Sequence, residues 1–115
     1  MSVSSDVSRQ KLRTLSRALF GGAQYRLEVG LAIAECDGLV CIKDLAEDLG
    51  DPPGTGSVNT ELKVLERAGL LVRMAPEKGE RRVYLARQDS MYWEFCREMG
   101  ARGSSASRRL RTRGR

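Results

Sequence analysis

Apolar side chains recur at the spacing of an α-helix in two stretches near the N-terminus. Between residues 8 and 19 the apolar positions are Leu12, Leu15 and Leu19. Arg13 and the other basic side chains of this stretch lie elsewhere around the helical wheel, so the pattern predicts an amphipathic helix that ends at the following pair of glycines. A second helix is predicted from about residue 23 to residue 35, and its two adjacent apolar stripes indicate deep burial.

Short apolar runs and turn signals alternate in the middle of the chain. The run Leu39 to Ile42 is typical of a minor edge strand, and a third helix is predicted over Lys43 to Leu49. The segment Asp51 to Gly56 contains two prolines and two glycines, so no helix is expected to pass through it. A fourth helix follows, with Thr55 or Ser57 as its expected cap, and an apolar stripe turned toward the core.

The second half of the chain predicts a hairpin and a last helix. Leu70 to Met74 and Arg82 to Ala86 have the character of strands joined by a polar turn. Asp89 or Ser90 is expected to cap a helix over Met91 to Met99. The tail that follows contains too few apolar residues to order itself.

This order of elements is that of a winged helix-turn-helix with extra N- and C-terminal helices, a mostly α fold with a small β-hairpin (α+β). We expect four parts. They are an N-terminal amphipathic helix for dimerisation over residues 1–21, a winged helix-turn-helix DNA-binding domain over 22–88, a C-terminal helix for dimerisation over 89–100, and a disordered Arg-rich tail over 101–115.

Several short motifs carry a resemblance to a known family. They are Asp44-Leu45-Ala46, the segment from Leu62 to Leu71, which reads LKVLERAGLL, and Arg81-Arg82 with Tyr84. With them, the stretch from Tyr25 to Leu85 resembles winged-helix bacterial regulators of the ArsR and MarR type. The resemblance implies DNA binding and pairing of two chains through terminal helices.

Charge is distributed in bands along the chain, whose formal net charge is +5. Residues 1–26 hold five basic side chains and one acidic, residues 27–51 one basic and seven acidic, and residues 59–87 seven basic and four acidic. Six arginines and no acid follow from Arg102 to Arg115. The banding predicts one acidic and one basic face, and the basic one suits a nucleic acid.

The fourth helix and the hairpin supply the candidate DNA contacts. If the apolar stripe of that helix faces the core, short polar side chains near its N-terminus can read base edges, and Asn59 suits an adenine. Basic side chains beside them would bind phosphates. The DNA-binding residues predicted in this way are Ser57, Asn59, Thr60, Lys63, Arg67, Lys78, Arg81 and Arg82.

The expected partners are double-stranded DNA and a second copy of the chain. A lone winged helix would leave the apolar stripes of its flanking helices partly uncovered, which favours a homodimer. The predicted dimerisation residues are Leu12, Leu15, Leu19, Tyr92, Phe95 and Met99.

Two other interpretations stay open. The acidic band suits a winged-helix module that binds a protein partner, with DNA binding absent or nonspecific. The basic tail suits an architectural protein that binds DNA without sequence preference.

Composition argues against catalysis and against a membrane protein. The chain contains no histidine, its three cysteines form no CxxC pair, and Ser57 stands where a phosphate-binding loop needs lysine, so we expect no enzyme, no cofactor and no metal site. Nothing in it spans a membrane or resembles a signal peptide. We therefore expect a cytoplasmic transcriptional regulator that reads a specific DNA sequence.

Overall fold

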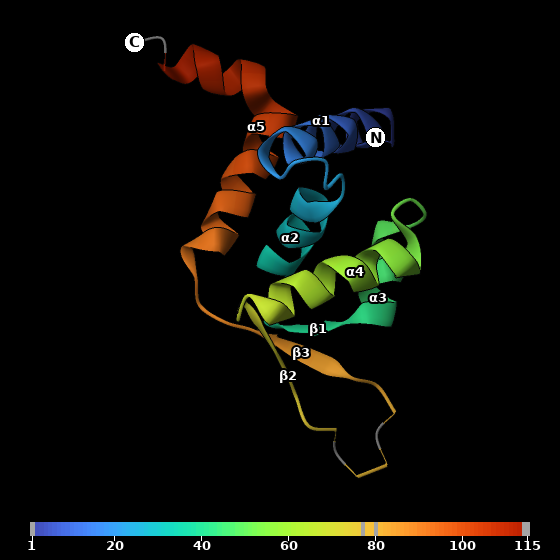
Figure 1. Ribbon diagram of the computed structural model, residues 1–115. Helices are drawn as coiled ribbons and strands as arrows, with labels where there is room; N and C mark the ends of the chain where they lie inside the picture. Colours follow the sequence, from blue (N-terminus) through green and yellow to red (C-terminus); the bar gives the residue numbers. More distant parts are fainter. Residues whose placement is uncertain (1, 77, 80, 114–115) are drawn as a thin grey trace.

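The computed structural model describes the backbone of residues 2–76, 78–79 and 81–113 and, within these ranges, the side chains of residues 8–102. The fold is mostly helical, with a small antiparallel sheet (Figure 1). In chain order the elements are α1 Ser2–Leu19, α2 Arg26–Ala34, β1 Leu39–Cys41, α3 Ile42–Leu49, α4 Gly54–Arg67, β2 Leu71–Arg73, β3 Tyr84–Arg87 and α5 Met91–Arg113.

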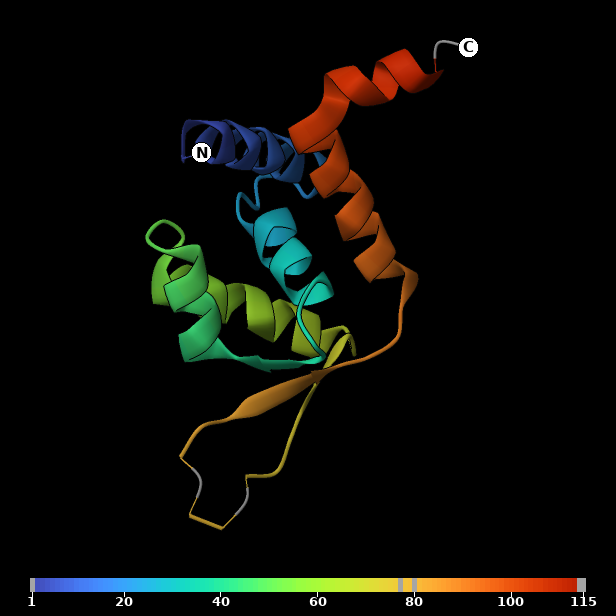
Figure 2. The same ribbon diagram turned by 180° about the vertical axis from the view of Figure 1, so that it is seen from behind.

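The sheet confirms the predicted hairpin and the predicted edge strand. The strand order is β1-β3-β2, with both pairings antiparallel. Ala86 in the central strand is paired with Leu39 on one side and with Val72 on the other. The helices lie on one side of the sheet, and the hairpin of β2 and β3 extends away from them (Figures 1 and 2).

The core forms where the predicted apolar stripes meet. Val58, Leu62 and Leu65 of α4 are at most 3% exposed, as their helical spacing predicts. They join α2, whose Leu27 and Ile33 are fully buried. The stripes of α2 and α4 therefore share one core, which fixes the outer face of α4.

Two predicted helix starts have different outcomes. The Ser90 hydroxyl accepts a hydrogen bond of 3.0 Å from the Tyr92 N–H, so Ser90 caps α5 as expected. The predicted caps of α4 are wrong, because that helix begins at Gly54 and places Thr55 and Ser57 inside it. The preceding Pro53, which has no N–H to satisfy, leads directly into the helix without a side-chain cap.

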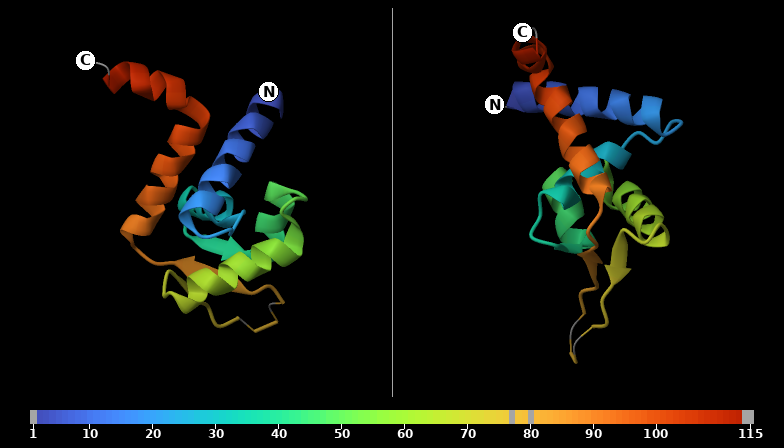
Figure 3. Two further views of the ribbon diagram at one scale, coloured as in Figure 1. Left: turned by 45° about the horizontal axis from the view of Figure 1, so that its top comes forward. Right: turned by 90° about the vertical axis from the view of Figure 1, so that its left-hand side faces the viewer.

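The C-terminal segment also differs from the sequence prediction. We expected the last helix to end at Met99 and the tail to be disordered, whereas the backbone of α5 continues to Arg113. Gly100 does not end the helix; it allows close packing, because a Cβ there would lie 2.7 Å from Leu31 Cδ2. The arginines and alanines of the tail are themselves favourable in helices. Figure 3 shows in two views that the N-terminal end of α1 and the C-terminal turns of α5 lie at the opposite end of the molecule from the tip of the hairpin.

A buried glutamate meets a buried and a half-buried arginine where α1 packs against α2. Glu28 is 4% exposed, and Arg9 and Arg13 both donate hydrogen bonds to its carboxylate, Arg13 Nε at 2.7 Å from Oε1. Arg9 Nη2 also donates to the Leu49 carbonyl at the end of α3. We name these three charged side chains the Glu28 cluster. The prediction that Arg13 lies away from the packed face is wrong, because Glu28 provides a partner that lets this cation be buried.

Two arginines meet at the C-terminal end of α2. Arg87 Nη1, from β3, donates to the carbonyls of Ile33 at 2.7 Å, Ala34 at 3.0 Å and Cys36 at 3.0 Å. Arg97 of α5 donates to the Ala34 carbonyl at 2.6 Å. Both cations satisfy carbonyls that the helix itself leaves open and lie at the negative end of its dipole.

Candidate nucleic-acid interface

The outer face of α4 carries polar and cationic side chains. Asn59, Thr60, Lys63 and Arg67 are exposed, and Ser57 is half-buried. The Thr60 hydroxyl donates to the Gly56 carbonyl at 3.1 Å, so its hydrogen is used within the helix. The side chains of Asn59, Lys63 and Arg67, each one turn after the last, are the longer polar groups on this face.

Both glutamates of α4 are bound by arginines from other parts of the chain. Glu61 accepts a hydrogen bond of 2.8 Å from Arg26 of α2. Glu66 accepts two from Arg73 of β2, at 3.2 Å from Nε and 3.0 Å from Nη2. Their charges are therefore balanced within the fold, and Lys63 and Arg67 determine the sign of the outer face of α4.

The predicted cations of the hairpin differ in their surroundings. Lys78 and Arg81 are exposed. Arg82 is exposed as well, but its Nη1 donates to both carboxylate oxygens of Asp44, each at 2.7 Å. The hydrogen bond and the charge of Asp44 raise the pKa of the Arg82 guanidinium above its ordinary value. This pair ties the hairpin to α3, and Arg82 compensates an acid that would otherwise repel a phosphate.

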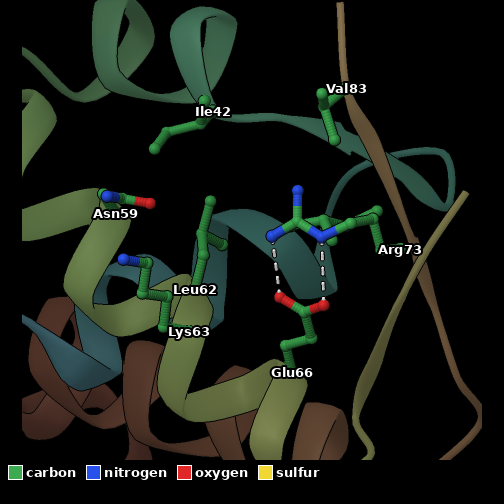
Figure 4. A pocket seen from close by; sticks show the side chains of 8 residues that line it. Ile42, Asn59, Leu62, Lys63, Glu66, Arg73 and Val83 are labelled. Carbon is green, nitrogen blue, oxygen red and sulfur yellow. Dashed lines mark hydrogen bonds and ion pairs between the residues drawn. The ribbon is translucent and has the colours of Figure 1, made fainter. Parts of the chain in front are cut away.

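A shallow hollow of about 50 Å³ lies where α4 meets the hairpin. Figure 4 shows Asn59 and Lys63 of α4 along one side of it and the paired Glu66 and Arg73 along another. Apolar side chains, Ile42 and Val83, stand opposite this pair. Sequence reasoning missed Glu66 and Arg73, although the two-residue period of a strand places Arg73 on the same face as the buried Leu71, toward α4.

The predicted dimerisation residues are in large part used inside the chain. Leu12 is 5% exposed and belongs to the core, so it is not open to a second copy in this structure. Leu15, Tyr92, Phe95 and Met99 are half-buried against the core. Leu19 is 51% exposed, and the neighbouring Phe20 packs edge-on against Phe95 at 6.5 Å. The structure thus explains much of the apolar pattern of α1 and α5 by their contact within one chain.

Two of the three cysteines are buried in the core region. Cys41 and Cys96 are buried, and burial raises the pKa of the Cys96 thiol to about 11. This thiol is neutral at ordinary pH, and its sulfur lies where a Cβ on Gly30 would be 2.6 Å away. Cys96 therefore fills the space at a close approach of α2 and α5.

Three acids of the acidic band, Asp44, Glu47 and Asp48, lie on the surface of α3. Glu47 and Asp48 are exposed there, while Asp44 is held by Arg82.

Within the described residues, no helix has the length and the apolar character needed to cross a lipid bilayer.

Comparison by sequence identifies no relative of this chain. No protein-family model matches the chain, and no curated protein is significantly similar to it in sequence. Function is therefore inferred from the geometry of α4, the hairpin and the hollow between them.

Proposed function

We propose that this chain is a DNA-binding transcriptional regulator that recognises a specific sequence in double-stranded DNA. In this proposal α3 and α4 form a helix-turn-helix, α4 enters the major groove, and the hairpin of β2 and β3 is the wing on the backbone or minor groove. The observation that carries the proposal is the outer face of α4. It presents Asn59, Lys63 and Arg67 outward while both of its glutamates are neutralised by arginines.

The two kinds of side chain have separate roles in the proposal. The Asn59 amide offers a donor and an acceptor, the pattern that reads an adenine edge. Lys63, Arg67, Lys78 and Arg81 supply charge for phosphates, which sets register and affinity but carries no sequence information. Arg82 can bind a phosphate in the same way only when its ion pair with Asp44 is broken.

Selection of bound duplexes from random DNA tests the proposal directly. Purified protein is expected to enrich a defined site, and a scrambled duplex of the same composition is expected to bind more weakly. Asn59→Ala should relax the preference at one base pair at a cost of about 1 to 3 kcal/mol, whereas Lys63→Ala should weaken both duplexes alike. If no site is enriched, or neither variant changes binding, α4 does not read the major groove.

A homodimer forms part of the proposal, because two copies would read a two-fold-related site. Leu19 and Met91, which are 51% and 83% exposed, are the apolar side chains of α1 and α5 that a second copy would cover. Leu19→Glu should lower the mass measured by light scattering from two chains to one. An unchanged dimer mass would exclude Leu19 from the interface.

The exposed acids Glu47 and Asp48 of α3 favour a second candidate function, binding of a basic protein surface. A gel-shift assay over a range of salt concentrations separates the two functions. Binding of duplex DNA that weakens steeply with salt supports the regulator, and absence of any shift at low salt favours the protein-binding module.

A further inference from the structure

The guanidinium of Arg73 is held in one orientation beside the outer face of α4. Its Nε and Nη2 atoms donate to the two carboxylate oxygens of Glu66, at 3.2 and 3.0 Å. Such a two-point pair fixes the plane of the guanidinium. The third nitrogen, Nη1, has no hydrogen-bond acceptor in the described part of the chain and points away from Glu66 into the hollow (Figure 4).

The surroundings of Nη1 are polar on one side and apolar on the other. Asn59 and Lys63 lie on the α4 side, and Ile42 and Val83 stand opposite Glu66 (Figure 4). The hollow is small, about 50 Å³. A phosphate oxygen with the neighbouring sugar has the right chemistry, because the oxygen accepts from a guanidinium and the sugar packs on aliphatic side chains.

We propose that Arg73 binds a phosphate of the DNA backbone through Nη1, with the attached deoxyribose against Ile42 and Val83, and that Glu66 is the positioning residue that aims it. This inference rests on the proposed function and extends it to a residue pair outside the predicted contacts. The pair carries no net charge, so its contribution is a directed, charge-assisted hydrogen bond and not an addition to the basic field.

A charge-matched double variant tests the contact. Arg73→Gln combined with Glu66→Gln leaves the net charge unchanged, so long-range attraction to DNA stays as in the wild type. Loss of one hydrogen bond to a charged group should weaken binding about tenfold or more. Because a phosphate contact carries no sequence information, binding of the selected duplex and of its scrambled counterpart should weaken by the same factor.

Arg17→Gln, which lowers the net charge by one, is the control for loss of an arginine away from the proposed contact. Arg17 is exposed on α1, a helix that lies away from the hairpin in Figure 1, and its removal should alter affinity by less than about twofold. Circular dichroism should confirm that every variant keeps its helical content. If the double variant binds like the wild type, Arg73 only neutralises Glu66 and the inference is overturned, while sequence-specific binding by α4 stands. If the wild type binds no duplex, the proposed function fails first, and this contact fails with it.

The role of Glu66 is tested by comparing two backgrounds. Glu66→Gln removes a negative charge near the DNA, which favours binding whether or not Arg73 is present. If Glu66 also aims Arg73, its substitution should have a different effect in the wild type than in the Arg73→Gln background. Equal effects in both backgrounds would show that Glu66 acts only by its charge and would overturn the positioning role.

Discussion

Arginine–carboxylate pairs occur in two regions of this molecule, and burial gives them different roles. In the Glu28 cluster the carboxylate and Arg13 are 3% and 7% exposed at the side chain, and the pair sits between α1 and α2. On the face formed by α4 and the hairpin, Arg73 and Arg82 are about half exposed in their pairs with Glu66 and Asp44. A buried pair is costly to break because the remaining charge has no solvent, whereas an exposed pair can open into water. Removing one partner of a buried pair should therefore destabilise the fold, whereas the exposed pairs are free to adjust what the surface binds.

Breaking the Glu28 cluster should have the largest effect on stability. Glu28→Gln removes the buried carboxylate that Arg9 and Arg13 share, at an expected cost of about 3 to 5 kcal/mol in the free energy of unfolding. Thermal denaturation should show a midpoint lower by more than about 10 °C. Glu47→Gln, at an exposed site on α3, is the control and should change stability by less than about 0.5 kcal/mol. If Glu28→Gln and Glu47→Gln lower the midpoint equally, the buried and exposed regions do not differ in how their charges affect stability.

A second substitution tests the close packing of α2 against α5. Gly30→Ala would bring a Cβ to 2.6 Å from Cys96 Sγ and should cost about 1 to 3 kcal/mol by overpacking. In urea denaturation, adding Cys96→Ala should recover part of this loss. Gly56→Ala is the matched control, because a Cβ there meets no atom within 4 Å and Gly56 lies inside α4. It should stabilise the protein by up to about 1 kcal/mol, and a destabilising effect would show that α4 is not packed as described.

The smallest expected change in stability comes from the exposed pair of Asp44 and Arg82. Asp44→Asn should alter the free energy of unfolding by no more than about 1 kcal/mol. If α4 and the hairpin bind DNA, the released Arg82 should steepen the plot of log affinity against log salt concentration by about 0.9, as expected for one added phosphate contact. If Asp44→Asn instead lowers the free energy of unfolding by several kcal/mol and leaves that slope unchanged, the pair has the same structural role as the Glu28 cluster.

The sequence predicted those parts of the fold that depend on local periodicity. Val58, Leu62 and Leu65 fall on one side of a helix by spacing alone, and the hairpin follows from two short strands around a polar turn. The exposure of Asn59 and Lys63 follows in turn, since those residues lie on the opposite side.

Features that join distant segments were not predictable in this way. Arg13 is polar by type, and only the position of Glu28 on a neighbouring helix explains its burial. Gly100 looks like the end of a helix until Leu31 of α2 is placed against it. The pairing of Glu66 with Arg73 likewise depends on how β2 leaves α4, which no periodicity specifies.

The convergence of Arg87 and Arg97 on the end of α2 restricts how this architecture can vary in length. Arg87 of β3 and Arg97 of α5 both donate to the Ala34 carbonyl oxygen. The end of α2 is therefore a common attachment point for the hairpin and for the last helix. Residues added at the tip of the hairpin lengthen it without disturbing α5. A residue added in the turn after α2 moves this attachment point itself, and with it the hairpin and α5 together. Related chains should accordingly tolerate insertions at the hairpin tip and keep the length of that turn constant.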